Sequence, residues 1–248
     1  MLAMQCPKCG AEGEAEASEC SSCGVLFAKV RPPEERPVPV EAGESTAAGE
    51  PRHWVDRLGA MLLPEPEPTS MAVLVVRAVF LVILATWSAS FMLAGPRSPA
   101  LGASFLHLIH LVFHEAGHVV FMPFGRFLMV LGGALLQVSV PVVFVVYFVR
   151  WRDDVYAASV CTFWTGQSLM DLAPYVSDAR ALDLVLLGGR TGKEVEGHDF
   201  EYLLTATGLL QWDIALGRLV FLAGSLVVVA GLAWGGANLW RQRQRIAA

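Results

Sequence analysis

Charged side chains are scarce in this sequence and unevenly distributed. Asp, Glu, Lys and Arg make up 17% of the 248 residues and hydrophobic residues 54%, an apolar share above that of an ordinary soluble domain. Long apolar runs fill residues 71–248, whereas residues 1–70 hold more than half of the acidic side chains, so the net charge of −5 comes from this first part. Because that part is acidic, we expect no nucleic-acid partner.

A secretory signal is also missing, since the first residues lack a basic beginning and a short apolar core. We therefore expect the amino-terminal part to lie in the cytoplasm. Cysteine is scarce too, and four of the five cysteines form two pairs, Cys6-x-x-Cys9 and Cys20-x-x-Cys23. In a reducing compartment such pairs indicate metal binding rather than disulfides. Cys161 stands alone in an apolar run and is expected to be a small buried hydrophobic residue.

The two cysteine pairs predict a zinc ribbon over residues 1–28. Gly10 and Gly24 follow the pairs and allow the tight turns that direct backbone amides toward the sulfurs. Four thiolates then hold one structural zinc ion, which replaces the hydrophobic core that so short a segment cannot build. We expect the ribbon to contact substrate or a protein partner.

Residues 29–70 are predicted to be a disordered linker, because Pro, Glu, Ala and Gly dominate them without periodicity. Before Pro64 a few apolar residues recur at helical spacing. They form either a short helix on the membrane surface or part of the disordered segment. These residues are Trp54, Leu58, Met61 and Leu62.

The remainder, residues 71–248, predicts an all-α polytopic membrane helix bundle with five to six transmembrane segments. A membrane-spanning helix needs about 20 mainly apolar residues, and Pro, Gly or charged residues separate runs of that length. We expect the second and fourth spans to be parallel and the protein to be integral to the cytoplasmic membrane. The expected helices cover about 72–95, 101–123, 127–149, 155–176 and 213–240, with a shorter segment near 200–211.

The second expected span contains the sequence His114-Glu115-Ala116-Gly117-His118. His114 and His118 are one helical turn apart, so both imidazoles can reach one metal ion. In sites of this pattern zinc is bound by the two histidines, and the glutamate takes a proton from water that the metal activates. Glu115 is therefore the expected general base.

Ionisable side chains inside a bilayer support a metal site over a chance pattern, because each is unfavourable by about 2.5 to 3.5 kcal/mol on insertion scales. His107 and His110 share a helical face with the two histidines of the motif. We expect these two additional residues to support the ligands or line water rather than to bind the metal.

The third metal ligand is expected near the end of the fourth span, where Asp171 and Asp178 flank Pro174. The proline interrupts the helix and frees backbone groups, which is tolerated where they line a cavity. Asp171 and Asp178 are thus rival candidates for this ligand, and Asp178 should lie in the same leaflet as His114 and His118. His198-Asp199 is a further candidate or simply the start of a solvated loop, and Gly132, Gly133 and Gln137 of the third span face the same side, where they provide close packing or a polar contact to substrate.

These residues resemble the site-2 protease family of intramembrane zinc metalloproteases over residues 101–180. That family combines HExxH in one span with Asn-x-x-Pro and then Asp-Gly two spans later. Here the first motif matches fully, Asp171-Leu172-Ala173-Pro174 stands for the second, and Asp178-Ala179-Arg180 for the third. The resemblance implies that His114, His118 and Asp178 hold zinc and that Glu115 is the general base. Asp171 and Ala179 depart from the family pattern.

The resemblance implies an intramembrane zinc endopeptidase that cleaves membrane-embedded protein substrates. The alternative is a non-proteolytic zinc-binding membrane scaffold or sensor, which the departures at Asp171 and Ala179 keep open. Glu115 favours the enzyme, because a purely structural zinc site does not need an unliganded carboxylate beside it. A transporter is less favoured, since no internal repeat is evident.

Overall fold

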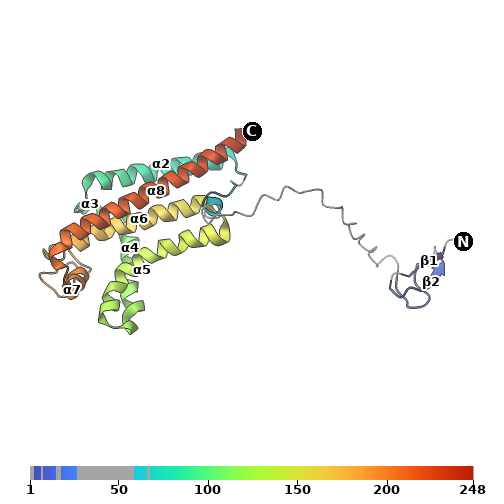
Figure 1. The fold of residues 1–248 in the computed structure, drawn as a ribbon, viewed down its shortest axis with the longest axis horizontal. Helices are drawn as coiled ribbons and strands as arrows, with labels where there is room; N and C mark the ends of the chain where they lie inside the picture. The colour runs from blue at the N-terminus through green and yellow to red at the C-terminus, as the bar shows by residue number, and fades with distance from the viewer. Residues whose placement is uncertain (1–2, 7, 15–17, 27–58, 66–67, 248) are drawn as a thin grey trace. The chain divides into compact units, whose positions relative to one another are not determined.

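The computed structural model of the chain describes all residues except 1–2, 7, 15–17, 27–58, 66–67 and 248 (Figure 1). The chain divides into two compact units, Met1–Arg52 and His53–Ala248. Most of the predicted linker, including Trp54 and Leu58, lies outside the described residues. Residues 59–62 are helical, and the Leu62 carbonyl accepts a hydrogen bond of 2.7 Å from the Trp234 indole.

The first unit contains a short antiparallel hairpin. Strand β1 (Ala3–Gln5) pairs with β2 (Glu12–Glu14), with Met4 opposite Gly13. Cys6 follows β1 directly, so the first cysteine pair lies in the turn of this hairpin. The second pair lies between Glu19 and Leu26, which form an antiparallel bridge.

The second unit is helical, as predicted. Serine side chains cap three of its helices: Ser70 Oγ accepts from the Val73 amide, Ser98 Oγ from the Ala100 amide and Ser104 Oγ from the His107 amide. Most helices begin and end within four residues of the expected positions, but the last helix ends seven residues later than expected and the short segment near 200–211 ends five residues earlier. The long ones are α2 (Met71–Ala94), α4 (Phe105–Phe121), α5 (Arg126–Tyr147), α6 (Val155–Ser177) and α8 (Asp213–Ala247), and the short ones are α3 (Pro99–Gly102) and α7 (Asp199–Ala206).

Four helical segments among the described residues are long and apolar enough to cross a membrane: Met71–Ala94, Phe105–Phe124, Arg126–Arg152 and Leu210–Ile246. Large apolar side chains point outward along them, and Val76, Val112 and Val143 are each more than 60% exposed. Such surfaces are unfavourable in water and expected in lipid. The structure therefore supports an integral membrane protein.

The predicted fourth span, α6, is not among these four segments, so the expected number of five to six spans is too high by this criterion. Its 23 residues bury many polar side chains, including Thr165, Gln167 and Ser168. Figure 1 shows α6 beside α8, and it also contacts α5 and α4. A helix surrounded by other helices need not match lipid, so its polar residues lower its hydropathy without exposing them.

Close backbone contact holds α6 against α8. A Cβ atom placed on Gly166 would lie 2.6 Å from the Gly224 carbonyl oxygen, and one on Gly224 would lie 2.7 Å from the Gly166 carbonyl oxygen. Such mutual contact of small residues is typical of helix pairs in membranes, where close packing replaces the hydrophobic effect. The buried core beside this contact consists of Leu84, Phe91, Leu101, Phe163, Met170 and Val228.

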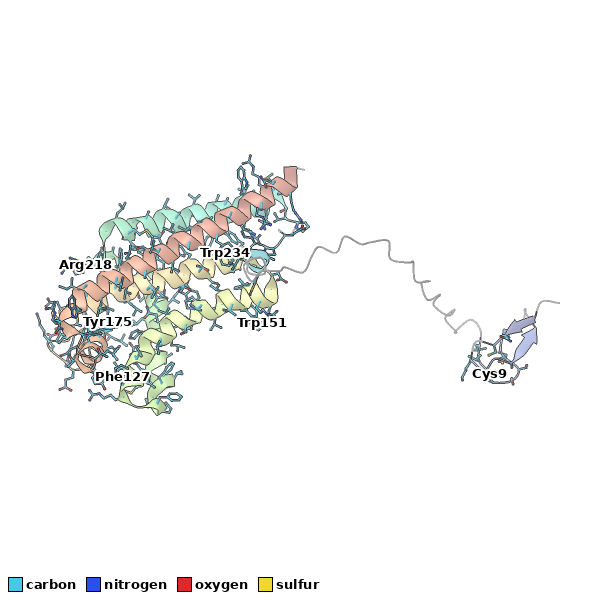
Figure 2. The ribbon with its side chains drawn as sticks, in the orientation of Figure 1. Cys9, Phe127, Trp151, Tyr175, Arg218 and Trp234 are labelled. Atoms are coloured by element: carbon cyan, nitrogen blue, oxygen red, sulfur yellow. The ribbon has the colours of Figure 1, made fainter. Side chains whose placement is uncertain are left out.

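At one end of the bundle the chain leaves α6, forms a loop over residues 178–198 and enters α7. Figure 2 shows Tyr175, in the last turn of α6, at the end where α7 lies in Figure 1. The Tyr175 hydroxyl accepts a hydrogen bond of 3.0 Å from the amide of Asp199, the first residue of α7. This contact fixes the start of α7 against the end of α6.

Candidate metal centre

Two histidines and one aspartate meet where α4, α5 and α7 come together. His114 and His118 lie in the second half of α4, and Asp199 begins α7. Asp199 Oδ2 lies 2.8 Å from His114 Nε2 and 3.2 Å from His118 Nε2. Their ligand atoms all fall within 4.8 Å of one another, so these three residues, here called the His2Asp site, could hold a metal ion.

Glycines of α4 and α5 make room at this site. A Cβ atom on Gly133 would lie 2.7 Å from the Nε2 atoms of both His114 and His118. A Cβ atom on Gly117 would lie 2.1 Å from the Gly132 carbonyl oxygen. The absence of these side chains lets α5 approach α4 closely and leaves space beside the two Nε2 atoms. The predicted packing role of Gly132 and Gly133 is therefore confirmed.

The hydrogen bonds of His118 fix its tautomer. Its Nδ1 lies 2.9 Å from the Met129 carbonyl oxygen. A carbonyl oxygen can only accept, so Nδ1 carries the proton and donates. In the neutral ring, Nε2 then carries a lone pair, and this nitrogen faces the Asp199 carboxylate.

Gln137 fixes the tautomer of His114. The Gln137 amide nitrogen lies 3.3 Å from both the Ser168 carbonyl oxygen and Asp171 Oδ2. Both are acceptors, so the amide nitrogen belongs on that side and Oε1 faces His114 Nδ1, at 2.9 Å. His114 Nδ1 therefore donates, and its Nε2 also presents a lone pair to the site.

This arrangement of donors and acceptors fits a cation. Both Nδ1 atoms donate elsewhere, so a hydrogen bond from either Nε2 to Asp199 would require a second proton on that ring. A metal ion satisfies two neutral imidazoles and one carboxylate together. Tetrahedral zinc with bonds of about 2.1 Å separates its ligands by about 3.4 Å, so His118 Nε2 at 3.2 Å from Asp199 Oδ2 is near that spacing and His114 Nε2 at 2.8 Å is closer than it.

Burial and the neighbouring histidines shift the pKa of Asp199 in opposite directions. Burial raises the pKa of its carboxyl, but when the rings of His114 and His118 carry a second proton, their hydrogen bonds to the carboxylate outweigh burial and hold that pKa below its usual range. Asp199 is therefore a carboxylate, the form that binds metal.

Asp178, the expected third ligand, lies elsewhere. Its carboxylate accepts hydrogen bonds from the amides of Asp183 at 3.0 Å and Leu184 at 2.9 Å, and it lies 3.4 Å from His198 Nε2. Within the described part of the chain it belongs to no group of metal-ligand atoms. Asp178 instead organises the loop that leads to Asp199, so the geometry moves the third-ligand assignment to Asp199.

His198 supports the same loop. Its Nδ1 accepts a hydrogen bond of 3.2 Å from the Glu201 amide and so caps α7. Burial holds the pKa of His198 below its ordinary value, despite the nearby charges of Asp178 and Asp199. Sequence reasoning named the pair His198-Asp199 as a candidate but gave no way to rank it above Asp178.

Asp171, the rival ligand, faces the two additional histidines of α4. Its Oδ1 lies 2.9 Å from His107 Nδ1, and its Oδ2 lies 3.2 Å from His110 Nδ1. It too is outside the groups of metal-ligand atoms found in the described residues. His107 and His110 thus contact an acidic residue beside the site, consistent with the expected supporting role.

Glu115 is half-buried on α4 between the two histidine ligands in sequence. Within the described residues no side chain is hydrogen-bonded or ion-paired with its carboxylate. A carboxylate that is neither a ligand nor engaged elsewhere is available to accept a proton.

A second group of potential ligands lies in the first unit. The thiols of Cys6, Cys9, Cys20 and Cys23 all fall within 4.8 Å of one another. The sulfurs of Cys6 and Cys23, and those of Cys9 and Cys20, are 3.7 Å apart, too far for a disulfide. Tetrahedral zinc with bonds of about 2.3 Å places its sulfurs about 3.8 Å apart. The spacing therefore fits one tetrahedral metal ion.

The two cysteine turns are alike. The Gly10 amide donates to the Cys6 carbonyl and the Gly24 amide to the Cys20 carbonyl, both at 2.8 Å, and both glycines have positive φ. Burial acts to raise the pKa of Cys6, but hydrogen bonds from nearby amides and thiols lower it to about 6. In Cys9 a hydrogen bond to backbone lowers the pKa, but neighbouring thiols raise it to about 12. A cation would favour all four thiolates together.

A scan against protein-family models, a search of curated proteins and a search of solved structures each found no match to this chain.

Proposed function

We propose that the second unit is an intramembrane zinc endopeptidase and that the first unit is a zinc ribbon. The observation that carries the proposal is the convergence of His114 Nε2, His118 Nε2 and Asp199 Oδ2, with both rings fixed in the tautomer that binds metal. Three protein ligands with an open fourth position are the pattern of catalytic rather than structural zinc.

Zinc, when bound, supplies a Lewis acid that polarises the reacting oxygen atoms. Glu115 accepts the proton of the attacking water and then donates it to the leaving amine, which is the work of a general base and acid. Its half-buried position and free carboxylate suit that exchange. Hydrolysis of a peptide bond is the reaction for which these parts are sufficient.

The substrate class follows from the surroundings of the site. The two histidines belong to a helix that is long and apolar enough to cross a membrane, and apolar side chains such as Val112 and Val119 cover its outer face. A substrate segment that reaches this helix through lipid must itself be apolar. We therefore propose that the substrates are membrane-embedded protein segments, with the ribbon as a docking module.

The test is Glu115→Gln. The change is nearly isosteric and removes the proton acceptor, so hydrolysis should fall by about a hundredfold or more, while metal content and fold stay unchanged. Cells producing either form are compared for single-span membrane proteins that accumulate uncut. Glu196→Gln, in the exposed part of the loop over 178–198, is the matched control and should behave as the native protein.

Metal analysis of both purified variants separates loss of chemistry from loss of the site. Uncut proteins that accumulate with Glu115→Gln alone, at full metal content, support the protease. A different result would identify a metal-binding scaffold or sensor instead. In that case His114→Ala would behave like deletion of the protein in cells, Glu115→Gln would behave like the native protein, and no membrane protein would accumulate uncut in either.

A further inference from the structure

A second cluster of polar side chains lies beside the His2Asp site. It joins α4, α5 and α6 through Asp171, His107, His110, Gln137 and Trp164. The side chains of Asp171 and His110 are only 8% and 1% exposed. An isolated ionisable group at membrane depth is unfavourable and is usually paired or functional, so the burial of this cluster requires an explanation.

The direction of each hydrogen bond in this cluster can be assigned. The Trp164 indole N–H can only donate, and it lies 3.0 Å from His110 Nε2. His110 Nε2 therefore accepts, and the ring proton sits on Nδ1, facing Asp171 Oδ2 at 3.2 Å. The amide nitrogen of Gln137 donates to the same oxygen. Asp171 Oδ2 thus faces two N–H groups, which favours the carboxylate form of Asp171.

The remaining oxygen of Asp171 faces His107. Oδ1 lies 2.9 Å from His107 Nδ1, and the His107 side chain is 34% exposed. The cluster therefore surrounds one carboxylate of α6 with polar side chains from two other helices, α4 and α5. Asp171 is buried, and among the described residues the hydrogen bonds that connect it to the His2Asp site run through Gln137, whose Oε1 accepts from His114 Nδ1 at 2.9 Å.

We infer that Asp171 is a positioning residue for the metal centre, acting on His114 through Gln137. Its negative charge orients and polarises the Gln137 amide, which holds the His114 ring with Nε2 toward the metal and makes that nitrogen a better ligand. His107 and His110 hold Asp171 in place. This inference rests on the proposed metal site and assigns Asp171 a role other than that of ligand.

The experiment measures Co2+ affinity of the full-length chain in detergent, with the four amino-terminal cysteines changed to serine so that only the His2Asp site binds. Asp171→Asn should weaken Co2+ binding about 10- to 100-fold, the usual effect of losing a residue that supports a metal ligand. The visible spectrum of bound Co2+ should also shift, because His114 no longer holds the same orientation.

Asp213→Asn is the matched control. Asp213 is a carboxylate that is 1% exposed in the same unit, but it pairs with Arg180 and does not contact the cluster. It should leave both Co2+ affinity and spectrum unchanged. If Asp213→Asn weakens binding as much as Asp171→Asn does, the effect comes from general loss of fold and the inference is overturned.

A double-mutant cycle tests the route through Gln137. In a Gln137→Met background, Asp171→Asn should change the affinity less than threefold, because the connection to His114 is already broken. An undiminished effect in that background would refute the route. Failure of the unsubstituted His2Asp site to bind Co2+ would instead refute the proposed function, so the two failures are distinguishable.

Discussion

Gly133→Ala offers the sharpest test of the metal centre, because it adds a single methyl group at the site. The new Cβ would lie 2.7 Å from the Nε2 atoms of both His114 and His118, whereas ordinary contact begins at 3.4 Å. Each ring must therefore withdraw by about 0.7 Å, more than three times the tolerance of about 0.2 Å for metal–ligand distances. We expect metal affinity to fall at least tenfold, or about 1.4 kcal/mol.

The assay is a competition titration of the purified full-length chain with Zn2+ and a chelating dye, together with a thermal unfolding curve. Gly236→Ala on α8 is the matched control, because a Cβ there meets nothing within 4 Å. It should keep full metal affinity and equal or higher stability, since alanine favours a helix by up to about 1 kcal/mol over glycine. Native affinity in a folded Gly133→Ala variant would refute the placement of the metal between these rings.

Three further outcomes are expected. Asp199→Ala should lower metal occupancy of the second unit far more than Asp178→Ala, as measured by metal analysis, because only Asp199 faces both histidines; the reverse order would return the ligand role to Asp178. Cys9→Ser should abolish the thiolate-to-Co2+ absorption of the first unit but leave membrane insertion intact, and loss of insertion would contradict the division into two units. Gly224→Ala should lower the unfolding temperature through overpacking of about 1 to 3 kcal/mol, because its Cβ would lie 2.7 Å from the Gly166 carbonyl oxygen; an unchanged temperature would show that α6 and α8 can separate freely.

Helix positions were predictable from the sequence because they follow from local pattern. Long apolar runs ended by proline, glycine or charge predicted the long helices to within four residues, except for the carboxyl end of α8, which lies seven residues further along. The expected number of membrane spans was too high by the composition criterion, because the polar side chains of α6 pack inside the bundle. Mean hydropathy depends only on the composition of a helix, so it does not show whether lipid or other helices surround it.

The sequence alone determined which residues of α4 share the face that could bind a metal and which cysteines lie together, since these are consequences of spacing along one segment. His114 and His118 share a helical face wherever the helix lies, and the four thiols follow from two equal turns. The third ligand depends instead on how a loop returns to the bundle. Three carboxylates, of Asp171, Asp178 and Asp199, were available, and only packing separated a positioning anion, a loop support and a residue facing both histidines.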